Sequence, residues 1–309
     1  MHLSLNTILP DLSLIPLPFM YVVVGVFGAI IGSFLNVVIH RLPLEESLVF
    51  PNSRCPSCQA SIAFYDNIPV LSYLLLRGRC RKCKAPISAR YPAVEALTAF
   101  LWVAVAWRDG LTYALPFDLI FVTAIVALIF IDAEHMILPN AITYPGIVFA
   151  LVARLALPYL MGPDCFDDMG SVCFDDVRGL KQIMPGGWPD PAASVAASLV
   201  GALIGALVGG GSLWLMGEAW KKLRGIEAMG LGDVKMMFMV GAYLGWRLTI
   251  LTIFFGALSG SIIGVAMTVR AGKNDLQSLL PYGIYLGIGS IVALFFGSQL
   301  VNWYAGFYQ

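Results

Sequence analysis

Apolar residues in this chain occur in long uninterrupted runs rather than in the short amphipathic segments of a soluble protein. A helix needs about 20 such residues to cross the hydrocarbon core of a bilayer. Eight runs are predicted as membrane helices: residues 17–39, 92–107, 114–131, 141–160, 191–216, 233–246, 248–269 and 281–304. The sixth is short and nearly merges with the seventh. The pattern predicts an all-α polytopic membrane protein with about eight transmembrane helices.

Glycines recur at intervals of four in two of these runs. Small residues at this spacing let helix backbones approach closely in lipid. We therefore interpret them as packing positions rather than ligand-binding ones: Gly201, Gly205, Gly209, Gly256, Gly260 and Gly264.

Composition supports the membrane assignment. The chain is 59% hydrophobic and only 12% charged, whereas soluble domains carry about 25% charged residues. A soluble enzyme is therefore excluded. The first fifteen residues contain no Lys or Arg, and no cleavage site for a signal peptidase follows the first run. We expect the first helix to remain in the mature protein.

Basic residues predict the orientation of the chain. The segment from His40 to Tyr91 is strongly basic, and such loops stay in the cytoplasm. Its basic residues are Arg41, Arg54, Arg77, Arg79, Arg81, Lys82, Lys84 and Arg90. Eight crossings then place two other basic loops inside and both termini outside. The loop after the fourth run falls outside and is acidic, with Asp164, Asp167, Asp168, Asp175, Asp176 and Asp190.

Two aspartates stand at the ends of apolar runs. Asp132 closes the third run, and Asp233 lies in Gly230-Leu-Gly-Asp-Val-Lys235 at the start of the sixth. An ionisable group at membrane depth costs on the order of 3 kcal/mol, so it usually has a function. The topology puts both at the cytoplasmic boundary, where they can share one proton as general base and general acid. The sequence predicts the catalytic pair of an aspartic protease, with the two roles unassigned because such a pair titrates as a unit.

Residues next to the two acids receive lesser roles. Gly230 and Gly232 are expected to leave room for an extended substrate backbone. Lys235 is interpreted mainly as an interfacial anchor, with substrate contact as the alternative. Glu134 and His135 are interpreted as polar boundary residues rather than catalysts.

Four cysteines form two C-x-x-C pairs, Cys55-Pro-Ser-Cys58 and Cys80-Arg-Lys-Cys83, separated by 21 residues. Two such pairs suit a tetrahedral structural zinc site. A redox pair or unligated thiols are the alternatives. The metal would fold a loop that lacks enough apolar residues for a core of its own.

The other two cysteines, Cys165 and Cys173, lie in the acidic loop. An oxidising compartment favours a disulfide between them, and free thiols are the alternative. The neighbouring aspartates lack the spacing of a calcium loop and are interpreted as solvated.

Several motifs in order resemble the bacterial type IV prepilin peptidases, also called prepilin leader peptidase/N-methyltransferases. They are Gly32-Ser-Phe-Leu-Asn-Val-Val-Ile-His-Arg-Leu-Pro43, the first cysteine pair, Asp66 to Cys80, Ile87 to Glu95, Ile131-Asp-Ala-Glu-His-Met-Ile-Leu-Pro-Asn140, Gly230 to Lys235 and Leu280-Pro-Tyr-Gly283. Two features depart from the family pattern: a long insertion from about Gly162 to Asp190, and Ile284 in place of a common proline.

The resemblance implies removal of the basic leader from prepilins and pseudopilins after a glycine, at the cytoplasmic face of the bacterial inner membrane. The four-cysteine loop implies a second activity, methylation of the new amino terminus from S-adenosylmethionine. No nucleotide-binding loop is visible. Arg77-Gly78-Arg79 and Glu95 are candidates for the methyl-transfer site, although Glu95 is more simply interpreted as a partner of Arg90. The expected partners are these substrates and the lipid bilayer, and no nucleic acid.

These observations predict three segments. Residues 1–39 hold the first membrane helix, and 40–91 form the zinc loop associated with methyl transfer. Residues 92–309 form the aspartic peptidase domain, with the acidic extracytoplasmic loop at 161–190.

Two other functions share some of these features. A presenilin-like protease also has Gly-x-Gly-Asp, but lacks the four-cysteine loop and has Tyr before its other aspartate, where this chain has Ile131. A proton-coupled transporter regulated by a zinc loop would have acids near mid-membrane and inverted repeats, neither of which is visible.

Overall fold

The computed structural model describes residues 16–161, 191–225, 229–271 and 281–307. These residues form helices and connecting loops without a β-strand. The predicted disulfide Cys165–Cys173 and the acidic loop lie outside the described residues. The chain forms two compact units, one of Met1–Arg41 with Ser47–Leu119 and one of Leu42–Glu46 with Ile120–Gln309.

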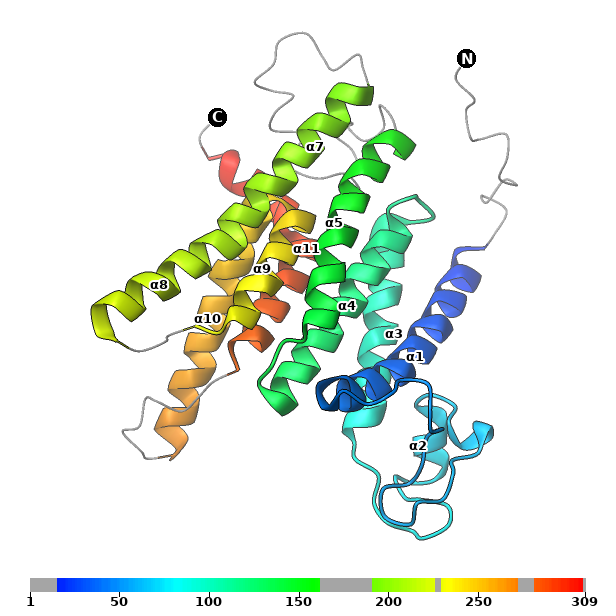
Figure 1. Cartoon of the computed structure of the whole chain (residues 1–309). Coiled ribbons are helices and arrows are strands. Elements are labelled where there is room, and N and C mark those ends of the chain that lie inside the picture. The colour runs from blue at the N-terminus through cyan, green and yellow to red at the C-terminus, as the bar shows by residue number, and fades with distance from the viewer. Residues whose placement is uncertain (1–15, 162–190, 226–228, 272–280, 308–309) are drawn as a thin grey trace. The chain divides into compact units, whose positions relative to one another are not determined.

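The first unit is built on two helices that lie side by side, α1 (Leu17–Arg41) and α3 (Arg90–Asp109) (Figure 1). Glycines of α1 allow the close approach. A Cβ atom at Gly28 would lie 2.9 Å from the Cα atom of Ala99, and one at Gly32 would lie 2.7 Å from the Cα atom of Glu95. Only glycine fits at such contacts, so Gly32 brings Glu95 directly against α1.

The segment between these two helices contains little regular structure. Its short helices are η3 (Leu42–Leu44), η4 (Phe64–Asp66) and α2 (Leu71–Leu75). Two isolated antiparallel bridges, Arg54 with Ser61 and Arg79 with Pro86, flank the two cysteine pairs.

The second unit is a helical bundle around a short helix. Its elements are α4 (Leu115–His135) from Ile120 onward, α5 (Asn140–Met161), α7 (Pro191–Ala206), the π-helical segment η6 (Leu207–Gly211), α8 (Ser212–Arg224), α9 (Leu231–Leu244), α10 (Trp246–Ala271) and α11 (Tyr282–Ala305). Helix α9 contacts α5, α7, α10 and α11 and is mostly buried (Figure 1). Because the surrounding helices enclose α9, its first residues are held in a fixed position.

The expected glycine packing is confirmed at four positions. A Cβ atom at Gly205 would overlap the carbonyl oxygen of Gly241 in α9, and one at Gly209 would overlap that of Met237. Gly256 and Gly260 in α10 face α11 in the same way, with a Cβ atom 3.1 Å and 3.3 Å from its side chains.

The expected count of eight membrane spans is not confirmed by the described part of the chain. Among the described residues, six helices, including the continuous stretch Val195–Arg224, are long and apolar enough to cross a bilayer. Helices α3 and α9 occupy the other two predicted runs. Charged residues near both ends of α3, such as Arg90 and Arg108, lower its mean hydropathy, and α9 has only 14 residues.

A buried arginine holds the carboxyl end of α9. Arg154 of α5 is fully buried, and its Nε and Nη2 atoms donate to the carbonyl oxygens of Ala242 and Tyr243, each at 3.0 Å. Carbonyls in the last turn of a helix have no partner within the helix, and a cation there is favoured by the helix dipole. Arg154 therefore fixes the end of α9 opposite Asp233.

Replacing Arg154 by methionine is expected to destabilise the protein by about 2–4 kcal/mol, because two buried carbonyls lose their donor. Thermal unfolding of the purified protein in detergent measures the loss. Arg154→Lys, which keeps one donor group and the charge, should lose less. Equal stability of wild type and Arg154→Met would contradict this role.

Candidate active site and metal centre

The two predicted catalytic aspartates line one cavity of about 380 Å³ in the second unit. Asp132 lies in the last turn of α4 and is 5% exposed, and Asp233 lies in the first turn of α9 and is partly exposed. The rest of the wall is formed by Met136, Ile137, Leu138, Pro139, Asn140, Gly230, Gly232 and Lys235. The fold thus brings together two acids that are 101 positions apart in the sequence.

The amino terminus of α11 holds Asp132. The Oδ2 atom of this carboxylate accepts a hydrogen bond from the backbone N–H of Ile284 at 3.1 Å. The first N–H groups of a helix lack internal partners, and the helix dipole favours a negative charge there. A Cβ atom at Gly283 would lie 2.8 Å from the same oxygen. This contact explains the glycine of the late Pro-Tyr-Gly motif, which the sequence did not connect with the site.

Asp233 is positioned by the start of α9. Gly230 is extended and precedes the helix, and a Cβ atom there would lie 3.5 Å from the Oδ2 atom of Asp233. A Cβ atom at Gly232 would lie 3.0 Å from the Cβ atom of Leu138, in the loop before α5. Gly232 therefore seats α9 against that loop, so the space at this glycine is taken by Leu138 and not open to a substrate backbone.

Lys235 is bound at the cavity wall. Its Nζ atom donates to the Oδ1 atom of Asn140 at 2.9 Å and lies 5.3 Å from the ring centroid of Tyr144. Both contacts come from α5, so the ammonium group is held beside the acids. Glu134 and His135, by contrast, do not line this cavity, and their side chains approach each other at 3.8 Å.

The four cysteines of the two pairs gather in the first unit. Their sulfur atoms lie within 4.8 Å of one another, and those of Cys55 and Cys83 are 3.8 Å apart. Tetrahedral zinc–thiolate bonds of about 2.3 Å place sulfurs about 3.8 Å apart. The donor set and its spacing therefore fit zinc.

The two cysteine pairs have the same local backbone. Each first cysteine donates its N–H to the carbonyl five residues later and accepts from the N–H four residues later. The residue that donates this second bond is Gln59 in the first pair and Lys84 in the second, and their φ values are 56° and 60°. The backbone N–H groups of Cys58 and Ser57 lower the pKa of the Cys55 thiol to about 6. Cys55 is thus arranged to present thiolate, the form that binds metal.

Of the proposed methyl-transfer candidates, Glu95 is buried at 8% exposure. Its partner is not Arg90, as the sequence suggested: its Oε2 atom accepts from the backbone N–H of Val70 at 2.7 Å. Arg77 and Gly78 form a tight turn with φ values of 52° and 66°.

The sequence matches two family descriptions. Residues 26–109 match the Bacterial Peptidase A24 N-terminal domain, and residues 191–265 match the Type IV leader peptidase family. No solved structure matches the chain.

Three similar proteins carry the name prepilin leader peptidase/N-methyltransferase. That of Legionella pneumophila is 31% identical over 94% of this chain and 96% of its own length, and that of Aeromonas hydrophila is 37% identical over 93% and 95%. That of Myxococcus xanthus is 39% identical over 83% of this chain, which spans 65% of that protein.

Proposed function

The chain belongs to the prepilin leader peptidase/N-methyltransferase family, and on this basis we propose that it removes the basic leader from type IV prepilins and pseudopilins. Cleavage follows a glycine and occurs at the cytoplasmic face of the inner membrane. The new amino terminus is then methylated from S-adenosylmethionine. The peptidase proposal depends on one observation above all, the meeting of Asp132 and Asp233 in one cavity.

The surroundings of the two acids support different roles for them. Asp233 and Asp132 line the same cavity, and two neighbouring carboxylates do not readily ionise together. The N–H of Ile284 and the α11 dipole favour the charged form of Asp132. In this proposal Asp132 is the ionised base and Asp233 holds the shared proton.

Hydrolysis then follows the general scheme of paired carboxylates. Asp132 takes a proton from water, and the water oxygen bonds to the scissile carbonyl carbon. Asp233 gives its proton to the carbonyl oxygen. When the C–N bond breaks, the proton on Asp132 passes to the leaving amine, and the hydroxyl proton returns to Asp233. Lys235, held beside the acids, adds a positive charge to the wall that receives the substrate.

Zinc has a structural role in this proposal. Cys55, Cys58, Cys80 and Cys83 would hold it, and when bound it fixes the two turns that frame the loop between α1 and α3. All four ligand positions are taken by thiolates, so the metal is not assigned any catalytic step.

Serine at Cys58 or Cys83 is expected to lower zinc from about one ion per chain to almost none, because a tetrahedral site loses a ligand. Elemental analysis of the purified protein measures this. Methylation should fall further than cleavage, since the aspartates belong to the other unit. Ser57→Ala, a change in the same turn that removes no ligand, serves as the control for zinc content. A fully methylating wild-type protein without zinc would contradict the proposal.

The proposed function as a whole is tested with a purified prepilin, with and without S-adenosylmethionine. Mass spectrometry should show loss of the leader in both reactions and the added mass of one methyl group only in the second. An intact prepilin after incubation with wild-type protein would refute the peptidase, and a cleaved, unmethylated product in both would refute the methyltransferase.

A further inference from the structure

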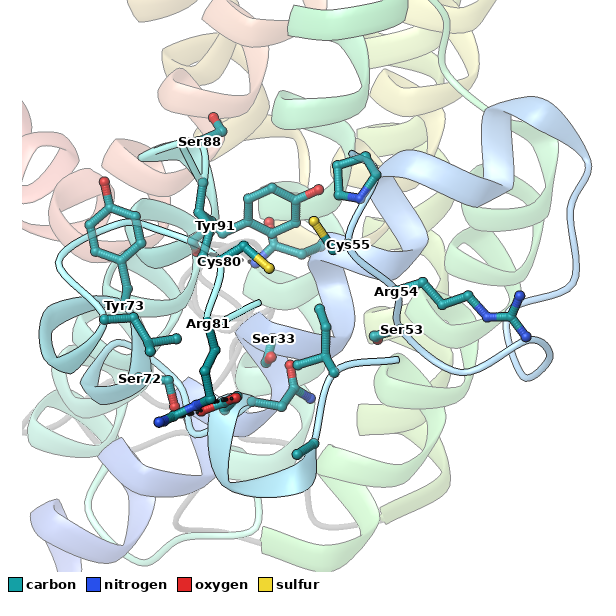
Figure 2. Close-up of a pocket in the computed structure, with 18 of the residues that line it drawn as sticks. Ser33, Ser53, Arg54, Cys55, Ser72, Tyr73, Cys80, Arg81, Ser88 and Tyr91 are labelled. Carbon is teal, nitrogen blue, oxygen red and sulfur yellow. Dashed lines mark hydrogen bonds and ion pairs between the residues drawn. The ribbon is translucent and has the colours of Figure 1, made fainter. Parts of the chain in front are cut away.

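The first unit contains a cavity of about 510 Å³ that shares no lining residue with the cavity of the two aspartates. Its wall is formed by α1, the two cysteine turns, α2 and the start of α3. Figure 2 shows Tyr91 beside Cys55 and Cys80 in this wall, with Ser33 and Arg81 also lining the cavity. The volume lies in the range of small-molecule and cofactor sites, about 300–1,000 Å³.

Glu95 gives the cavity a buried negative group. Among the described residues its partners are neutral donors, the backbone N–H of Val70 and the hydroxyl of Ser33. A buried carboxylate without a cation is unfavourable. A positively charged ligand in the cavity would therefore stabilise its ionised form.

The backbone around Val70 is arranged to serve this carboxylate. Val70 has φ 59° and ψ −48°, and the N–H of Leu71 donates to the carbonyl of Pro69 across it. This is a γ-turn of the rare type with a β-branched residue at positive φ, a costly conformation. Such strain persists mainly where the surrounding structure holds a functional group in place. Here it directs the N–H of Val70 to Glu95.

Asn36 adds an unsatisfied acceptor to the same wall. It is 4% exposed, and its Nδ2 atom donates to the carbonyls of Gly32 and Tyr91 at 3.3 and 3.1 Å. Its Oδ1 atom has no partner in the described part of the chain. Buried polar atoms are nearly always paired, so this oxygen is available to a donor group of a ligand.

The other acid of the cavity is already neutralised. Asp66 accepts three hydrogen bonds from Arg81, at 2.6 to 3.0 Å, and these bonds lower the pKa of Asp66. Tyr65, Tyr73 and Tyr91 also line the cavity and offer aromatic surface on which a base can stack. The wall thus combines one carboxylate without a cation partner, one free acceptor and aromatic rings. It also includes the basic residues His40, Arg41, Arg54 and Lys82.

We propose that this cavity binds S-adenosylmethionine, with Glu95 as the anion that selects its sulfonium charge. A purine, hydrogen-bond donors and a fixed positive charge are the features that this wall complements. The proposal rests on the methyltransferase function proposed above and assigns the residues of that site. The cysteine turns then contribute a wall of the donor site, while Arg77-Gly78-Arg79 lies outside it.

The test compares two ligands that differ in charge at sulfur. S-adenosylhomocysteine has a neutral thioether, whereas both compounds carry the same adenosyl and amino-acid groups. Equilibrium binding is measured on the zinc-loaded full chain. Glu95→Gln should weaken S-adenosylmethionine about tenfold and leave S-adenosylhomocysteine nearly unchanged, as expected for the loss of one partly buried charge contact. Glu218→Gln, a change at a partly exposed acid on α8, makes the same change in net charge and should alter neither.

Zinc content confirms that each variant keeps the first unit folded. Ultraviolet crosslinking of radiolabelled S-adenosylmethionine to the wild type gives a second readout, and the labelled peptide should fall within residues 33–95. A label in residues 120–307, equal weakening of both ligands by Glu95→Gln, or no binding to the wild type would each overturn the proposal. Methylation by the wild type in any of these cases leaves the proposed function standing, and its absence refutes that function too.

Discussion

Asparagine in place of Asp132 or Asp233 is expected to abolish leader cleavage, with a rate loss of at least about 10³-fold. The substitution keeps the shape of the side chain but removes the group that accepts or holds the shared proton. Single-turnover cleavage of a prepilin measures the loss.

Both variants should insert and accumulate normally, because neither carboxylate is needed to hold the bundle together. Methylation of a pilin that has already lost its leader should persist, since Glu95 and the cysteines belong to the other unit. Glu134→Gln, next to the pair but outside its cavity, is the matched control and should cleave normally. Cleavage by either asparagine variant at more than a tenth of the wild-type rate would refute the pair.

Valine at Gly283 is expected to reduce cleavage by at least about 10²-fold, because small displacements of catalytic groups have effects of this size. Even a Cβ atom there would lie 2.8 Å from the Oδ2 atom of Asp132. The carboxylate must then move away from the N–H of Ile284 that orients it.

Alanine at Gly283 should have a smaller effect in the same direction, since it adds the Cβ atom but not the two methyl groups of valine. Gly217→Ala in α8 is the control, because a Cβ atom there makes an ordinary contact, 3.6 Å from that of Met229. Thermal unfolding separates a loss of activity from a loss of stability. Normal cleavage by Gly283→Val would show that the α11 terminus does not position Asp132.

The sequence indicated the two acids and the four cysteines for definite reasons. Asp132 and Asp233 stand out because charge is expensive at the ends of apolar runs. The cysteines stand out because two C-x-x-C turns at a suitable separation can direct four sulfur atoms at one metal ion. Both the energetic cost of a charge in an apolar run and the spacing of cysteine ligands can be read from a sequence.

Contacts with the backbone of a distant segment were not visible. Asp132 is oriented by an N–H group 152 residues away, and Arg154 binds carbonyls 88 and 89 residues away. Any residue other than proline supplies the same N–H and C=O groups, so the side-chain pattern does not single out such partners.

Two interpretations of the sequence, the pairing of Arg90 with Glu95 and a membrane span at 233–246, are not supported by the structure, and each has a physical reason. Arg90 and Glu95 are five residues apart on α3, and residues at that spacing do not share a helix face. Glu95 instead meets Val70 through a γ-turn that sequence propensities do not favour. The run at 233–246 gives a helix of only 14 residues, because Gly245 interrupts it before α10.

The most direct measurement of the central claim is the single-turnover cleavage rate of the double variant Asp132→Asn/Asp233→Asn beside the two single variants. Groups that act as one unit have non-additive effects, because losing either one disables both. The residual rate of the double variant should therefore equal that of the single variants. If the double variant were instead slower than the wild type by the product of the two single-variant losses, the acids would act independently. That result would contradict a shared catalytic site.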